Sequence, residues 1–347
     1  MAQILPKNRK TSKTGAWKTN GNKNGSKIPP SALLSLHKTM LLIRQAEEKI
    51  ADLLQAKEIN CPTHLYTGQE AVAAGVCANL GKEDYVFGTH RSHGHFLAKG
   101  GNLNSMMAEL YGKTGGCAKG RGGSMHLLDP GIGILGTTPI VASGIALAVG
   151  TALASYIRED GRVTAVFFGD GAVEEGRFHE ALNLSALYKL PIVFVCENNL
   201  YSSHVHLDER QPLDAIFKHA DAYGIPGERI DGNNVVDVFQ TARKALSRAR
   251  GGQGPSLLEC RTYRWRGHVG PNYDLEKGIR SVKEWEAWKK KCPVKALESG
   301  LLSQKIITRA QLEALYSATA RLIEESVAFA RNSPLPEPEE VLDNVLK

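Results

Sequence analysis

The chain has 347 residues, of which 42% are hydrophobic and 23% are charged. These values are typical of a globular protein with a substantial core, and they exclude collagen-like and disordered chains. The net charge of +7 suggests a nucleic-acid-binding protein, but residues 1–27 hold seven basic residues and no acidic one, which leaves 36 basic and 36 acidic residues in the rest. A basic nucleic-acid binder therefore rests on this tail alone.

The tail 1–27 is rich in Lys, Asn, Gly, Ser and Thr, so we expect it to be disordered. It lacks the apolar core of a signal peptide and the arginine-rich amphipathic pattern of a transit peptide. A solvated tail, an arm that contacts anions and an arm that docks a partner are all compatible with this composition. The six cysteines form no C-x-x-C pair, which favours reduced thiols and a cytoplasmic protein.

A single domain is predicted over residues 28–332. Its first helix is expected to begin at Ser31, acting as N-cap. Residues 140–157 carry no charge, but their many small residues predict a core or subunit-interface helix and not a membrane span, so no membrane association is expected. Helices are also expected at 213–223, 235–250 and 308–330, followed by an extended tail at 333–347.

Two continuous apolar runs, 163–168 and 191–196, predict central parallel strands that are buried on both faces. The intervening stretch 174–188 has helical spacing and is ended by Pro191, which makes a βαβ unit. A further strand is expected at 256–260. The predicted fold class is therefore α/β, with a parallel sheet flanked by helices on both faces.

Polar loops follow both runs: Gly169-Asp170-Gly171-Ala172 and Asn198-Asn199-Leu200-Tyr201. Alone, each is typical of a tight turn or a loop cap. Together, at the carboxyl ends of neighbouring strands, they predict a site for a divalent metal and a diphosphate, because Asp170 and Asn199 offer the oxygen ligands that Mg²⁺ or Ca²⁺ prefers. The glycines let the backbone approach a phosphate, and a helix starting near Val173 would add its N-terminal amides.

Three histidines fall within six residues in His90-Arg91-Ser92-His93-Gly94-His95. A zinc site made from these three is disfavoured, because zinc sites usually include a distant ligand and the interposed arginine repels a cation. The remaining interpretations are a solvated polar loop and a loop that reaches a cofactor phosphate.

Four motifs in order, between about residues 31 and 288, resemble the alpha subunit of the E1 component of two-chain 2-oxoacid and acetoin dehydrogenases. They are His64-Leu65-Tyr66-Thr67-Gly68-Gln69-Glu70-Ala71, the glycine-rich segment 115–126, the split motif described above, which is similar to the thiamine diphosphate signature, and Thr262-Tyr263-Arg264-Trp265-Arg266-Gly267-His268. The resemblance implies the thiamine diphosphate-binding fold and, as cofactors, thiamine diphosphate and Mg²⁺.

Carried over by position, the resemblance implies that Asp170, Asn199 and the main-chain oxygen of Tyr201 ligate the metal. It assigns the diphosphate to the amides of Gly171 and Ala172 and to the side chains of Arg91 and Arg264, with His90 at a further phosphate-contact position. Backbone groups of Gly133 and Leu135 would meet the aminopyrimidine. His268 matches the active-site histidine near the diphosphate, and His64 matches a second histidine near the substrate channel.

The resemblance also implies an E1 beta subunit, in an alpha2beta2 heterotetramer, that supplies a glutamate to the aminopyrimidine nitrogen. The implied reaction is cleavage of a 2-oxoacid such as pyruvate, or of acetoin, with transfer of the acyl unit to the lipoyl group of an E2. A carboligase that passes the acyl unit to an aldehyde or ketone is the alternative. The sequence leaves the small-molecule acyl donor open.

Overall fold

The computed structural model describes residues 28–342, so the predicted basic tail lies outside the described residues. Six strands form one sheet in the order β2-β1-β3-β4-β8-β7, with every neighbouring pair parallel. Their bounds are β1 Tyr85–Thr89, β2 Ile134–Thr138, β3 Thr164–Gly169, β4 Ile192–Asn198, β7 Gly227–Asp231 and β8 Ser256–Arg261. The predicted α/β fold class, with its parallel sheet, is confirmed.

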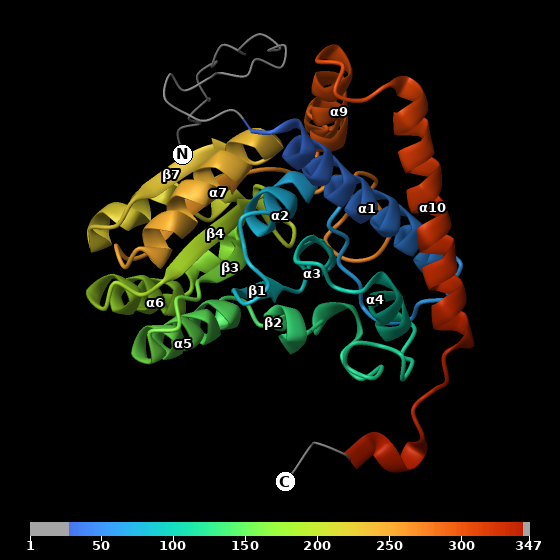
Figure 1. Cartoon of the computed structure of the whole chain (residues 1–347), viewed down its shortest axis with the longest axis horizontal. Coiled ribbons are helices and arrows are strands. Elements are labelled where there is room, and N and C mark those ends of the chain that lie inside the picture. The colour runs from blue at the N-terminus through green and yellow to red at the C-terminus, as the bar shows by residue number, and fades with distance from the viewer. Residues whose placement is uncertain (1–27, 343–347) are drawn as a thin grey trace, which may run out of the picture.

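Helices cover both faces of this sheet (Figure 1). Side chains alternate along β3, so Val166 and Phe168 face one layer while Ala165 and Phe167 face the other. The first layer holds α5 (Ser143–Arg158) and α6 (Gly176–Leu187), and the second holds α2 (Glu70–Cys77) and α7 (Val235–Arg250). Because each buried Phe or Val contributes roughly 1.5–3 kcal/mol, the apolar runs that predicted these strands also form the core.

A third group of helices packs beside the sheet, where α1 and α10 run alongside each other (Figure 1). This group consists of α1 Pro30–Gln55, α3 His93–Ala98, α4 Leu103–Leu110, α8 Val282–Lys289, α9 Pro293–Ser303 and α10 Arg309–Asn332. Within the described part of the chain, none of the helices is both long and apolar enough to cross a membrane.

Several predicted boundaries differ from the structure. Ser31 lies inside α1, whose N-cap is Pro29, so Ser31 does not cap this helix. The helix expected from Val173 begins at Gly176, because residues Asp170–Glu174 form a 3-10 turn (η3) and Glu175 is extended. At α1 the cause is local, because Pro30 takes a first-turn position that suits proline. Before α6 the cause is tertiary, because Gln211 and Arg210 contact the Asp170 carbonyl and Glu174.

Two further segments differ in helix type. The helix expected at 213–223 is the 3-10 segment η5 (Ile216–Tyr223), in which the Phe217 amide donates to the buried Glu259 carboxylate. The tail expected to be extended at 333–347 contains the 3-10 segment η6 (Pro338–Leu342) in its described part. There Arg121 donates to the Glu340 carbonyl, a long-range contact that a local pattern does not reveal.

Candidate functional site

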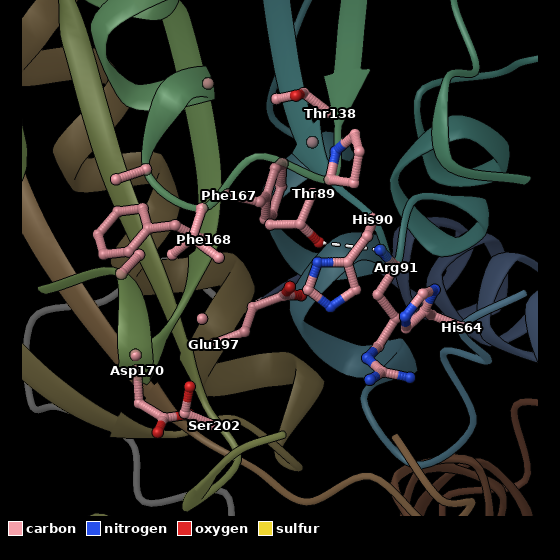
Figure 2. A pocket seen from close by; sticks show the side chains of 18 of the residues that line it. His64, Thr89, His90, Arg91, Thr138, Phe167, Phe168, Asp170, Glu197 and Ser202 are labelled. Carbon is pink, nitrogen blue, oxygen red and sulfur yellow. Dashed lines mark hydrogen bonds between the residues drawn. The ribbon is translucent and has the colours of Figure 1, made fainter. Parts of the chain in front are cut away.

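A cavity of about 200 Å³ lies at the carboxyl ends of β1, β3 and β4 (Figure 2). The loops after β3 and β4 form one side with Asp170 and Ser202, and the segment after β1 forms the other with His90 and Arg91. Residues 138–142, after β2, complete the wall. The predicted site is therefore found at the edge of the sheet where parallel strands open a crevice.

The acidic side of the cavity is centred on Asp170, the first residue after β3, which is buried. Burial raises the pKa of Asp170, while Arg210 forms an ion pair with it and opposes that rise. Arg210 also contacts Glu174, and Gln211 donates to the Asp170 carbonyl at 3.1 Å. A buried carboxylate thus lies beside the cavity with a countercharge from a loop forty residues later in the chain.

Asn199 and Tyr201 follow β4 and line the same cavity as Asp170. The Asn199 side chain accepts from the Tyr201 amide at 3.2 Å, and its amide group donates to Gln69 at 3.0 Å. Tyr201 starts a short hairpin of β5 (Tyr201–Ser202) and β6 (Val205–His206). The structure therefore brings together the oxygen donors that the split motif predicts.

Gly171 and Ala172 line the cavity within η3. A Cβ atom at Gly171 would lie 2.4 Å from the Ser202 Oγ, so no larger residue fits there without a shift of the hairpin. The sequence predicts that a glycine here lets the backbone approach a phosphate. The structure gives a second reason for a glycine at this position, which is the close approach of two loops. The amides at this end belong to a 3-10 turn and not to the start of α6.

Two buried arginines lie on the basic side, but of the two only Arg91 lines the cavity. Arg91 donates to the His268 carbonyl at 3.2 Å. Arg264 lies behind the lining, where it donates to the carbonyl of Ser203, a cavity residue, and lies 3.4 Å from the Asp274 carboxylate. Burial, more than any other cause, lowers the pKa of Arg91 to about 10 and of Arg264 to about 9. Both guanidiniums therefore stay charged at neutral pH, and an anion beside them would stabilise the charged form.

Three histidines converge on this basic side: His64, His90 and His268. Their ring centroids lie 4.5, 4.9 and 5.5 Å apart in edge-on contacts. Burial first, and then Arg91, lowers the pKa of His64 to about 3, of His90 to about 2 and of His268 to about 3. All three are therefore neutral at neutral pH.

The other two histidines of the 90–95 cluster point elsewhere. His93 lies 3.0 Å from Glu47 and 2.8 Å from the Ser124 Oγ, and His95 lies 3.1 Å from the Glu197 carboxylate. Both are buried, so the interpretation of this stretch as a solvated loop is wrong. Of the three histidines, only His90 lines the cavity, beside Arg91.

Gly133 and Leu135 are not among the residues that line the cavity. They lie at the start of β2, and a Cβ atom at Gly133 would lie 2.1 Å from the Asp84 carbonyl oxygen. The contact of their backbone groups with an aminopyrimidine therefore stays a prediction. At the opposite end of β2, residues 138–142 line the cavity.

Two side chains of the site, Arg210 and Glu197, were not predicted from the sequence. No motif surrounds Arg210. The only signal for it is that a buried carboxylate such as Asp170 needs a countercharge. Glu197 lines the cavity and accepts from Tyr66 and His95. The available signal for Glu197 was a charged residue directly after the apolar run 191–196 and before the polar loop, because such a residue is buried only with partners.

Comparison with known proteins decides the family. The model of the family described as "Dehydrogenase E1 component" matches residues 38–339. The chain belongs to this family. Among curated E1 relatives, it is 39% identical to the alpha subunit of acetoin:2,6-dichlorophenolindophenol oxidoreductase of Bacillus subtilis, over 93% of this chain and 96% of the relative.

A second E1 relative is the pyruvate dehydrogenase E1 component subunit alpha of Porphyra purpurea, at 41% identity over 91% of this chain and 93% of the relative. The acetoin:2,6-dichlorophenolindophenol oxidoreductase alpha subunit of Cupriavidus necator is 37% identical over 92% and 95%. The resemblance to E1 alpha subunits is thus confirmed along nearly the whole chain. Relatives of similar identity carry two different substrate names, so identity alone does not select one.

Proposed function

We propose that this E1 chain is the alpha subunit of a thiamine diphosphate- and Mg²⁺-dependent enzyme that cleaves a 2-oxoacid or acetoin and passes the acyl unit to the lipoyl group of an E2. The names of the curated relatives support the reaction class. The observation that carries the proposal is the cavity at the ends of the central strands, which Asp170 and Asn199 line together with the buried Arg91.

The cavity suits a metal-bound diphosphate. Asp170, Asn199 and the main-chain oxygen of Tyr201 would hold Mg²⁺, because they are hard oxygen ligands. The amides of Gly171 and Ala172 and the side chains of His90, Arg91 and Arg264 would hold the diphosphate. The lowered pKa of both arginines supports this assignment. Burial disfavours their positive charges, and a bound anion would compensate these charges. Thiamine diphosphate, when bound, supplies a carbon nucleophile and an electron sink.

The histidines on the basic side would manage protons during the reaction. His64 and His268 are neutral, so an imidazole nitrogen on each is free to accept a proton or to hydrogen-bond a developing charge. Arg91 holds the loop of His268 by its bond to the main-chain carbonyl. Buried apolar residues such as Ile145 and Phe167 line the cavity and reduce its access to water.

A beta subunit would provide the group that activates the aminopyrimidine. Among the described residues, Glu197 is the only glutamate that lines the cavity. It accepts hydrogen bonds from Tyr66 and His95 and is therefore committed within this chain. This arrangement supports an activating glutamate from a partner, and an alpha2beta2 assembly.

The test is reconstitution. The full alpha chain is mixed with an E1 beta chain, thiamine diphosphate and Mg²⁺, and consumption of pyruvate, acetoin and branched-chain 2-oxoacids is measured. We expect activity from the two chains together and none from the alpha chain alone. Turnover by the alpha chain by itself would contradict the proposal. A lipoylated E2 domain or an aldehyde, added in parallel, identifies the acyl acceptor.

A further inference from the structure

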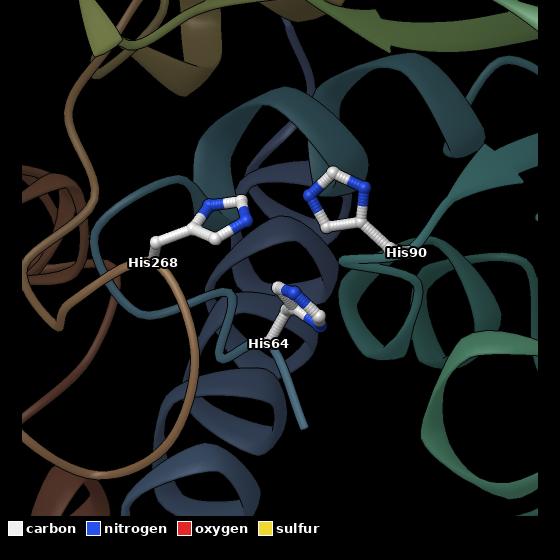
Figure 3. Close-up of side chains that lie close together, drawn as sticks. All are labelled: His64, His90 and His268. Atoms are coloured by element: carbon white, nitrogen blue, oxygen red, sulfur yellow. The ribbon is translucent and has the colours of Figure 1, made fainter. Parts of the chain in front are cut away.

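Three segments far apart in the sequence bring one imidazole each to the basic side of the cavity (Figure 3). His64 comes from the loop between α1 and α2, His90 follows β1, and His268 lies in the loop after β8. The ligand nitrogens of the three all lie within 4.8 Å of one another. This set differs from the local histidine cluster, because its members are held by separate elements of the fold.

One of these nitrogens lacks a partner. The Nδ1 atom of His64 is buried and has no hydrogen-bond partner among the described residues, and His64 as a whole is only 8% exposed. A buried polar atom without a partner destabilises the folded chain, so a ligand that engages the imidazole would recover part of this cost. The rings of His90 and His268 both contact that of His64.

We propose that His64, His90 and His268 form a binding site for a divalent transition metal ion, with Zn²⁺ as the reference ion, distinct from the oxygen-ligand site at Asp170 and Asn199. Imidazole is a ligand for zinc, copper and nickel, whereas Mg²⁺ prefers oxygen. Three histidines around Zn²⁺ leave a fourth position for water or an anion, at Zn–N distances of about 2.0–2.1 Å. The nitrogens need to move closer together, by rotation of side chains that already touch.

Protonation does not compete with the metal at this site. Zinc binds the neutral imidazole, and a metal usually has to displace protons from its histidines. Because burial lowers the pKa of each of the three well below neutral pH, their lone pairs are free in neutral solution.

The two arginines oppose the cation and determine what accompanies it. Arg91 and Arg264 both act on all three histidines. Their repulsion weakens the site relative to three histidines in neutral surroundings and favours an anionic fourth ligand, such as hydroxide, chloride or phosphate. We therefore expect inorganic phosphate to strengthen zinc binding.

Binding is tested on the full chain without cofactor, with excess Mg²⁺ present to occupy the oxygen ligands. Calorimetry with Zn²⁺ should show one site per chain, and Co²⁺ should give the visible absorption of four-coordinate cobalt without the bands of a thiolate ligand. His90→Ala should weaken zinc binding by at least about tenfold, since it removes one of three ligands. His90→Phe keeps a ring at that position and should show the same loss.

His179→Ala is the matched control, because His179 and His219 form a separate histidine pair whose ring centroids lie 5.3 Å apart. Its zinc affinity should equal that of the unsubstituted chain. Unchanged zinc binding in both folded His90 variants, or loss in His179→Ala instead, would overturn the site. So would a full chain that binds no Zn²⁺ in the presence of Mg²⁺. None of these readouts depends on catalytic turnover.

Discussion

Asp170 is a buried carboxylate. Burial raises its pKa, and the ion pair with Arg210 opposes that rise. Mg²⁺ would add a second countercharge at the same oxygens. Asp170→Asn keeps the shape but removes the charge, so we expect Mg²⁺-dependent binding of thiamine diphosphate to weaken by at least about 100-fold. Calorimetry of the folded variant measures this, with Asp208→Asn as control because Asp208 is an exposed acid of the nearby loop. Equal affinity in Asp170→Asn would remove Asp170 from the metal site.

His64, His90 and His268 should also shape the response of the folded chain to acid. The pKa of each is lowered in the folded state by burial and by Arg91 and Arg264, with Asp274 opposing the shift at His268. The unfolded chain therefore binds more protons as the pH falls below about 6.5, and the free energy of unfolding decreases toward pH 3. Above about 6.5 this penalty is absent.

Urea denaturation between pH 7.5 and pH 5 measures this loss of stability. Replacing His90 with Gln removes one group that must stay uncharged, so the decrease should be shallower than in the unsubstituted chain. His126→Gln, at an exposed histidine outside the cluster, is the comparison for the effect of a His-to-Gln change. An identical slope in His90→Gln would contradict the assigned protonation states.

At the scale of elements, the glycine-rich segment 115–126 folds around a single carboxylate. The two oxygens of Glu109, in α4, accept four main-chain hydrogen bonds at 2.7–3.0 Å, from the amides of Ala118, Gly120, Gly122 and Gly123. The glycines are explained by this convergence, since a Cβ atom at Gly120 would lie 2.5 Å from the carbonyl carbon of Gly112. The segment is thus a structural cradle around Glu109, and it positions the Ser124 Oγ 2.8 Å from the His93 ring.

Glu109→Gln should therefore loosen this segment. An amide offers one acceptor oxygen, and its NH₂ group faces two main-chain donors, so at least one pair of amides loses its partner. We expect a loss of about 1–3 kcal/mol in the free energy of unfolding and faster proteolysis within 112–126. Glu313→Gln, on the exposed face of α10, is the control and should change neither. Wild-type stability and proteolysis in Glu109→Gln would refute the cradle.

At the scale of the whole molecule, apolar side chains on α5 and α6 are exposed although the core is well filled. Leu147 is 57% exposed, Ile157 70% and Leu187 71%. These two helices pack together beside the cavity, whose wall includes the residues just before α5. Exposed apolar groups of this kind are typical of a subunit interface, which agrees with the interpretation of residues 140–157 as an interface helix.

We therefore expect Leu147→Lys to weaken assembly with the beta chain while leaving the alpha chain folded. Sedimentation of the mixed chains measures assembly, and circular dichroism reports the fold. Leu335→Lys, at a leucine that is 63% exposed in the C-terminal segment, should assemble normally. Normal assembly of Leu147→Lys would exclude this part of α5 from the interface.

Local sequence was sufficient for the central strands and for α7 and α10. Their signals are long apolar or periodic runs, as in 163–168 and 235–250, and burial on both faces leaves few alternatives. It was insufficient at Ser31, because α1 already begins at Pro30, and near Val173, where Gln211 and Arg210 contact the Asp170 carbonyl and Glu174 before α6 begins. In the 3-10 segment 216–223 the Phe217 amide donates to Glu259, a contact from far along the chain that a local pattern does not reveal.

The amino-acid sequence alone was enough to predict the fold class, the family and the split motif at Asp170 and Asn199, because these depend on apolar runs and motifs that are contiguous in sequence. Only the tertiary structure decided which charges meet there. It pairs Arg210 with Asp170 and shows that Gly133 and Leu135 do not line the cavity. It also brings His90 close to His64 and His268. The physical reason is that ion pairs and metal coordination depend on distances of a few ångströms between side chains. The separation of two segments along the chain does not give these distances.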